Sequence, residues 1–246
     1  MSFDNKHWFV KFKRDPEEQK RDCLAYILGR SWANVAEVRP LNESEFADLR
    51  HVGIVTPEWA SMANTFLVRL GQDYTVDQLP NADIDSAVAS ELIFSLWIRR
   101  RDTHAANRAY TNRVPVFFDH QTAFLGESHL RNLDVFFQPG LDAGYASRWR
   151  VEIAGPAATV STAEMRRIGR ARDMAVHFAR EHSSFNKSIQ DAAERVQSQS
   201  REEWLWAARS VGYSKTQADE ITTFLEENCA ELYAAIERMR TVIVEH

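Results

Sequence analysis

The sequence predicts an α+β fold in two lobes, a small strand-rich N-terminal lobe at residues 1–72 and a larger helical lobe at residues 73–246. In the first lobe, short apolar runs have the period of strands. In the second lobe, wide apolar stripes recur at helical spacing. Two short strand-like runs joined by a polar turn add a hairpin to the helical lobe at residues 102–124.

The composition fits a folded protein with a packed core, because 44% of the 246 residues are hydrophobic. The net charge is −5 and charges of both signs are mixed, so no basic field favours direct binding of nucleic acid. Two distant cysteines provide neither a disulfide framework nor a metal cluster. The polar first residues lack a signal-peptide run, and no window is as long and apolar as a membrane span. We therefore expect a cytoplasmic protein with reduced thiols.

Residues 7–13 alternate between two faces, which predicts the first strand. Lys11 stands inside the apolar frame Phe-Val-Lys-Phe, and Lys13 follows on the same face. A lysine in such a frame either binds phosphate or discourages pairing at the edge of a sheet. Both interpretations stay open for Lys11, and Lys13 is the weaker candidate because it ends the strand.

The next elements are a helix and two strands. Asp15 and Pro16 predict a helix that runs to about Trp32, since Asp can cap a helix and Pro fits its first turn. Strands are expected at residues 35–41 and 65–70, and an irregular connection at residues 51–62 lies between them.

The helical lobe begins with a helix that Asp83 or Asp85 caps. Its apolar stripe is wide, which indicates burial on most sides. Three arginines at residues 99–101 end it and suit the negative end of the helix dipole. With two later arginines they could also form a basic rim for phosphate or an acidic substrate.

Residues 108–110 and 114–118 predict the two strands of the hairpin. A hairpin returns the chain on itself, so Asn107 is expected near Asp119, with Asp102 one loop earlier. Such oxygen ligands suit Mg²⁺ that is shared with substrate phosphates, and a further carboxylate can orient or deprotonate an attacking hydroxyl. The alternative is a polar surface hairpin whose Asp and Asn residues only cap turns.

The pattern Asp102-x-His104-x-x-Asn107, then a hairpin, then two apolar residues and Asp119-His120-x-x-Ala-Phe, resembles the HipA-like kinases. These belong with the phosphatidylinositol 3- and 4-kinase-like group of the protein-kinase-like superfamily. The resemblance implies a protein-kinase-like, two-lobed fold, and the few residues before Lys11 predict that its small lobe is truncated at the N-terminus. It implies that Asp102 is the catalytic carboxylate, that His104 supports the catalytic loop, and that Asn107 and Asp119 bind the metal.

The same resemblance makes Lys11 the phosphate-binding lysine. The family normally offers this lysine a Glu from the following helix, but here no Glu lies in the helix centre. Asp22 is the acid nearest to that position and Glu18 lies one turn earlier; the alternative is that both are solvated helix charges. The resemblance also implies a hinge whose backbone binds adenine at Val68 and Leu70.

Beyond the hairpin the chain is expected to be helical, and the resemblance no longer rests on motifs. Capping boxes predict helix starts at Ser161, Ser200 and Ser214. The last helix carries an apolar stripe from Ile221 to Ile243. We expect this stripe to cover the core, with a dimer seam as the alternative.

The resemblance thus implies an ATP- and Mg²⁺-dependent phosphotransferase that acts on Ser or Thr of a protein substrate. Only ten residues precede Lys11 and no glycine precedes Gly29, so a Gly-rich phosphate cover is missing from its usual place. A partner chain or another segment would have to complete that cover. Two alternatives remain: a pseudokinase or nucleotide-binding regulatory module that needs such a partner, and a helical interaction protein that binds no nucleotide.

Overall fold

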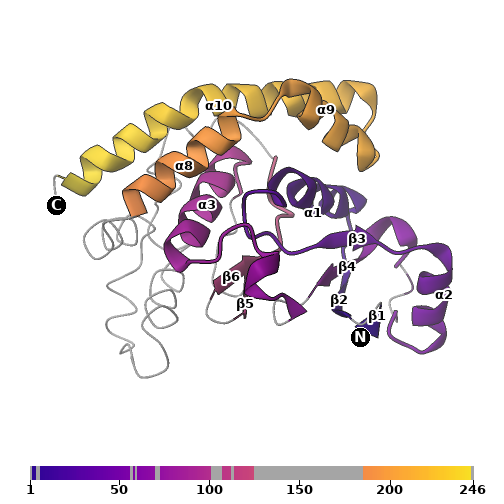
Figure 1. Ribbon diagram of the computed structural model, residues 1–246. Coiled ribbons are helices and arrows are strands. Elements are labelled where there is room, and N and C mark those ends of the chain that lie inside the picture. The colour runs from indigo at the N-terminus through magenta and orange to yellow at the C-terminus, as the bar shows by residue number, and fades with distance from the viewer. Residues whose placement is uncertain are drawn as a thin grey trace, which may run out of the picture.

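The structure is a computed structural model that describes residues 2–3, 6–55, 58, 60–69, 73–100, 107–111, 114–124 and 185–244. The chain is α+β, as predicted. Figure 1 shows the C-terminal helices across the top, the helices of residues 16–29 and 84–97 beneath them, and the sheet and the hairpin below.

Four strands form one antiparallel sheet in the order β1-β2-β4-β3. The strands are β1 (Ser2–Phe3), β2 (Lys6–Phe12), β3 (Val38–Pro40) and β4 (Thr65–Arg69). The central strand β4 is buried along its whole length. In the register of β2 and β4, Lys11 lies opposite Phe66 and Phe9 lies opposite Val68, so these four side chains share one face of the sheet.

The strand predicted at residues 35–41 is shorter in the structure, because the residues before β3 pair with the hairpin instead. The Ala36 N–H donates to the Phe117 carbonyl at 2.7 Å, and the Phe117 N–H donates to the Asn34 carbonyl at 2.7 Å. The predicted strand is therefore divided: residues 34–36 pair with the hairpin, and β3 pairs with β4 of the sheet.

Helix α1 (Pro16–Gly29) begins where the sequence predicts. The Asp15 side chain accepts from the Glu17 N–H at 3.0 Å, and Pro16 occupies the first turn. The helix ends earlier than expected, at Gly29. A Cβ atom at Gly29 would lie only 3.0 Å from Cζ of Phe94 and 3.1 Å from both Cγ atoms of Val35, so a larger residue would have to displace these core side chains.

Helix α2 (Glu43–His51) was not expected. Asn42 and Glu45 form a capping box, which is a local start signal that was overlooked. Only Leu49 is buried in α2, and it packs into a small cluster with Trp8 and Leu67 of the sheet. Where it is described, the predicted irregular connection at residues 51–62 holds a turn, and the short 3-10 helix η1 (Met62–Asn64) begins at its last residue.

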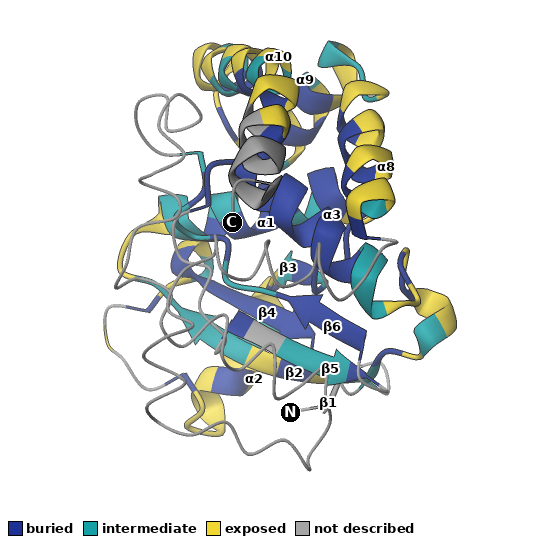
Figure 2. Ribbon diagram, turned by 90° about the vertical axis from the view of Figure 1, so that its left-hand side faces the viewer, coloured by how far each residue is buried: buried dark blue, intermediate teal, exposed yellow. Residues whose placement is uncertain are grey.

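Helix α3 (Ile84–Trp97) is the central helix of the molecule. Asp83 caps it, since its side chain accepts from the Ser86 N–H at 2.8 Å. Every residue of α3 from Ala87 onward is buried, as Figure 2 shows. The wide apolar stripe therefore indicated its burial correctly.

The hairpin consists of β5 (Arg108–Thr111) and β6 (Val114–Phe117), each within one residue of the prediction. Strand β6 is fully buried and packs against α3. Its hydrogen bonds with residues 34–36 fix the position of the segment that follows Phe117.

Three helices form the C-terminal layer: α8 (Phe185–Gln197), α9 (Arg201–Ser210) and α10 (Lys215–Val244). The predicted starts at Ser200 and Ser214 are confirmed by reciprocal hydrogen bonds with Glu203 and Gln217, whereas Ser161 lies outside the described residues. No helix in the described part of the chain is both long and apolar enough to cross a membrane.

The stripe of α10 belongs to the main core as far as its side chains are described. Leu225, Leu232 and Ile236 are buried there beside α3. Trp97 Nε1 donates to the Leu225 carbonyl at 3.1 Å, and Asn228 Nδ2 donates to the Trp97 carbonyl at 2.7 Å. These bonds join α10 to the end of α3.

Candidate functional site

Lys11 and Asp119 meet between the sheet and the hairpin. Lys11 Nζ lies 3.0 Å from Asp119 Oδ1, and both side chains are less than one-fifth exposed. The ammonium group also lies 6.0 Å from the Phe66 ring centre and 5.6 Å from that of Phe118. The structure thus brings together a lysine and a carboxylate that are far apart in the sequence, in a partly aromatic setting.

Asp119 has an unusual backbone conformation, with φ of +67°. The left-handed region is uncommon for residues other than glycine, although Asp and Asn enter it more readily than most. The preceding carbonyl, of Phe118, accepts from Arg100 Nη2 at 2.7 Å. Arg100 itself forms a buried ion pair with Glu91 of α3. The core helix therefore holds the turn that presents Asp119.

Asn107 lies beside this turn, as the hairpin predicts. Its carbonyl accepts from the Phe118 N–H at 3.0 Å, and the residue is almost fully buried. One hydrogen bond therefore joins Asn107 to the residue that precedes Asp119.

Asp22 is fully buried in α1, and its role differs from the one the resemblance implies. Its Oδ1 accepts a hydrogen bond from the His120 N–H, immediately after Asp119. Within the described residues Lys11 forms its ion pair with Asp119 and none with Asp22. The α1 carboxylate thus holds the Asp119 turn and is not the ion-pair partner of the lysine.

Lys13 is a second cation at the site. Its Nζ lies 3.6 Å from Asp119 Oδ1 and 3.6 Å from Glu18 Oε2, and its side chain is as shielded as that of Lys11. Lys13 was expected to be the weaker phosphate-binding candidate because it ends the strand, but its side chain reaches the same carboxylate as that of Lys11. The Lys13 N–H donates to the Asn64 carbonyl at 2.9 Å, which extends the pairing of β2 and β4 by one residue and keeps Lys13 aligned with Lys11.

The surroundings shift the pKa values of Asp22 and Asp119 in opposite directions. Burial raises the pKa of Asp22 to about 6, although Lys11 and the His120 hydrogen bond oppose the rise. Burial also acts to raise the pKa of Asp119, but the charges of Lys11 and Lys13 outweigh this and leave that pKa below its usual value. Asp119 therefore keeps its negative charge below pH 6, where Asp22 takes up a proton.

Several buried polar atoms at the site lack a hydrogen bond within the described residues: Lys11 Nζ, Asp119 Oδ1, Asp22 Oδ2 and His120 Nε2. The first two contact each other only as an ion pair. Burial lowers the pKa of His120 well below its usual value, so its ring is neutral at pH 7. Buried polar atoms are almost always hydrogen-bonded, so these four atoms have hydrogen-bonding capacity that the described part of the chain does not use.

A hard cation fits this arrangement in part. Asp119 provides an anionic oxygen, and Asn107 is a buried amide residue next to its turn. Among the described residues no group of three His, Cys, Asp or Glu side chains could hold a metal by itself. Mg²⁺ does not need such a group, because it commonly uses one or two carboxylates together with substrate phosphates.

The remaining predicted site residues fall elsewhere. Asp102, His104 and Leu70 lie outside the described residues. Val68 is fully buried in β4 opposite Phe9. Its backbone groups point toward β2, since the neighbouring Arg69 N–H donates to Glu37 on the other side of the strand. Because the Val68 backbone groups pair with β2, they are not available to bind adenine.

The arginines at the end of α3 do not form a surface rim where the structure describes them. Arg99 and Arg100 are both buried, and Arg101 lies outside the described residues. Arg99 has φ of +52° and stacks 4.4 Å from the Phe224 ring of α10. Glu91 is the only charged residue in the buried part of α3, and it was the sequence signal for a buried cation nearby.

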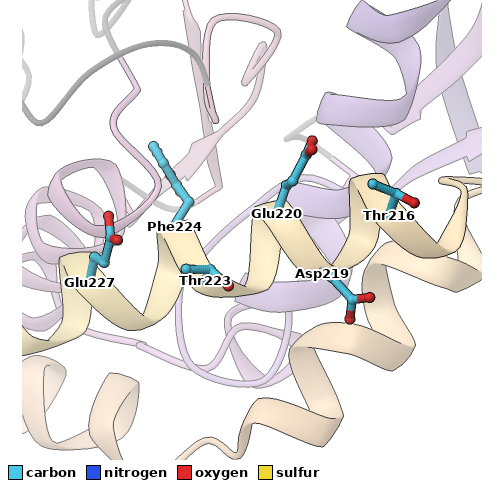
Figure 3. A pocket seen from close by; sticks show the side chains of 6 residues that line it. All are labelled: Thr216, Asp219, Glu220, Thr223, Phe224 and Glu227. Carbon is cyan, nitrogen blue, oxygen red and sulfur yellow. The ribbon is translucent and has the colours of Figure 1, made fainter.

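A separate open groove of about 470 Å³ lies along α10 (Figure 3). It is lined by Thr216, Asp219, Glu220, Thr223, Phe224 and Glu227. All six residues belong to one helix, and three of them are acidic. The negative charge disfavours a nucleotide there, so the groove does not compete with the Lys11 site as a phosphate-binding place.

Comparison of the chain with protein families, with curated proteins and with solved structures gives no match. The assignment of a function therefore rests on the residues and on the geometry of the Lys11–Asp119 site.

Proposed function

We propose that the protein is an ATP- and Mg²⁺-dependent phosphotransferase with a protein-kinase-like fold. The observation that carries the proposal is the contact of Lys11 with Asp119 at 3.0 Å, at the junction of the sheet and the hairpin. A phosphate-binding lysine and a metal-binding carboxylate that meet in this way are the two parts that a kinase needs around its nucleotide phosphates.

Each described residue has a chemical task in this proposal. Lys11 holds phosphate oxygens, and Asp119 with Asn107 holds the metal. Bound Mg²⁺ would neutralise the negative charge that spreads over the transferred phosphoryl group. Asp22 keeps the Asp119 turn in place through the His120 amide. The aromatic rings of Phe66 and Phe118 limit access of water to the lysine.

Asp102 is proposed to orient or deprotonate the attacking hydroxyl, with His104 supporting its loop. The phosphate acceptor is proposed to be a Ser or Thr of a protein, as the resemblance to HipA-like kinases implies. Leu70 remains the proposed contact for adenine on the same basis.

The second candidate is a nucleotide-binding regulatory module without transfer activity. It is favoured by the position of Asp22, which binds the His120 amide and forms no described ion pair with Lys11. Kinases depend on such a lysine–carboxylate pair for activity. Both candidate functions include a partner chain that completes the small lobe.

The proposal is tested by nucleotide-dependent stabilisation of the purified chain. With an affinity on the order of 0.1 mM, ATP at about 10 mM with Mg²⁺ would stabilise the fold by about 2.7 kcal/mol. For a chain of this size that corresponds to a rise in melting temperature of about 5–10 °C. Asp119→Asn removes the charge but suits the left-handed backbone, so we expect a folded variant that has lost the Mg²⁺-dependent part of this rise.

The control is Asp191→Asn, which makes the same chemical change at an exposed position of α8 and should behave as the parent does. Asp102→Asn should keep binding and lose transfer of phosphate to protein. If the Asp119→Asn variant is stabilised by Mg-ATP as much as the parent, the metal assignment is wrong. If the parent binds Mg-ATP but transfers phosphate to no protein, including itself, the regulatory module is the better description.

A further inference from the structure

Lys13 is the feature of the site that neither the resemblance nor the proposed function uses. It lies one residue beyond β2 and two residues after Lys11, and both ammonium groups lie within 4 Å of the same Asp119 oxygen. One carboxylate cannot neutralise two ammonium groups. The charge of Lys13 is therefore shared between Asp119 and Glu18 of α1.

The contacts of Lys13 are weaker than those of Lys11. Both of its carboxylate contacts are 3.6 Å long, compared with 3.0 Å for the Lys11 pair, and its Glu18 partner is nearly one-third exposed. Partly exposed pairs at such distances contribute little to stability. A group with more negative charge can displace them at a small cost.

Binding of a cation by Asp119 would remove the counter-charge of both lysines at once. Two compact ammonium groups side by side would then need an anion, and successive phosphates of a nucleoside triphosphate provide one. The flexible stem of Lys13 allows its ammonium group to move between Glu18 and a phosphate.

We propose that Lys13 is a second phosphate-binding lysine, which Glu18 holds in position until a nucleoside triphosphate replaces Glu18 as its partner. The inference rests on the proposed function and adds a binding residue to the same site. It predicts that the contribution of Lys13 depends on the number of phosphates in the ligand, because a second ammonium group needs a further phosphate to bind.

Calorimetric titration of ATP, ADP and AMP, each with Mg²⁺, tests this. Lys13→Met should weaken ATP binding by about 10- to 100-fold, the usual range for losing a hydrogen bond to a charged group. It should weaken ADP binding less and leave AMP binding unchanged. Glu18→Gln removes the competitor of the phosphate and should tighten ATP binding, while Lys13→Arg should keep most of the ATP affinity.

The matched control is Lys20→Met, which removes a partly exposed lysine that pairs with Glu17 on the same α1 helix. It should leave all three affinities unchanged. If Lys13 is only a structural tie between β2 and α1, Lys13→Met and Glu18→Gln will both weaken the three nucleotides equally, and the inference is overturned.

The outcomes separate the inference from the function on which it rests. A parent that binds none of the three nucleotides overturns the proposed function, and the role of Lys13 with it. A parent that prefers ATP, with a Lys13→Met variant of equal preference, overturns only the role of Lys13. A Lys13→Met variant that does not fold leaves the decision to Glu18→Gln and Lys13→Arg, of which the first must tighten ATP binding and the second must retain it.

Discussion

The buried ion pair of Arg100 and Glu91 allows a quantitative test of how the core supports the site. The two side chains are each 1% exposed. Ser95 Oγ donates to Glu91 Oε1 at 2.9 Å, and Arg100 Nη2 donates to the Phe118 carbonyl at 2.7 Å. Removing one partner leaves the other charge in the core, which typically costs about 3–5 kcal/mol.

We therefore expect Arg100→Met to lower the free energy of unfolding by about 3–5 kcal/mol, and the melting temperature by about 10 °C. Met retains most of the apolar stem, so the loss reports on the charge and on the donors. Urea unfolding followed by tryptophan fluorescence measures this, since Trp97 lies in the core 5.5 Å from the ring of Trp204. Replacing both partners with apolar residues, Glu91→Leu with Arg100→Met, should recover much of the loss.

The chain offers a matched control in the surface pair of Arg201 and Glu226, whose side chains are 41% and 52% exposed. Arg201→Met should cost about 0–1 kcal/mol, as exposed pairs do. If Arg100→Met costs no more than Arg201→Met, then the Arg100 charge is not held in the core as described, and the argument that α3 positions the Asp119 turn fails.

Two further predictions concern α1. Burial raises the pKa of Asp22 from 3.8 to about 6, so the native state keeps a proton that the unfolded chain releases between these values. The parent should lose stability as the pH rises from about 4 to about 6, by about 3 kcal/mol at most. Asp22→Asn should remove this part of the pH dependence of urea unfolding, and an unchanged slope would contradict the assignment. Gly29→Ala places a methyl group 3.0 Å from Phe94 and should destabilise by about 1–3 kcal/mol in the same assay; an unchanged midpoint would show that this contact is loose.

The sequence predicted the elements whose signals are local. Asp15 with Pro16, Asp83, and Ser200 with Glu203 start helices at the expected positions because a cap depends only on neighbouring residues. The hairpin was predicted to within one residue for the same reason. The strand at residues 35–41 was predicted too long because part of it pairs with Phe117, a partner that no local pattern reveals.

The site was predictable only in part. The hairpin placed Asn107 near Asp119, and the strand pattern singled out Lys11. Glu91 in the buried part of α3 indicated a buried cation nearby, but arginines after a helix usually serve its dipole in solvent, so residue types alone did not identify Arg100 as that cation. Residue types also did not show that the Asp22 side chain binds a backbone amide. From the sequence alone, the expected partner of a buried carboxylate is a nearby cationic side chain.

The contacts that build the site join segments that are far apart in the sequence and are therefore synthesised at different times. Asp22 and the His120 amide are separated by 98 residues, Arg21 and the Gln121 carbonyl by 100, and Asn34 and the Pro115 carbonyl by 81. Closing loops of this length costs entropy before any contact repays it, so such contacts tend to form late. A nascent chain that has reached only α3 holds β2 and α1 without the turn that Asp22 secures. Until the hairpin has been synthesised, the Asp22 carboxylate stays solvated. The site is therefore expected to form only when the whole N-terminal half has left the ribosome.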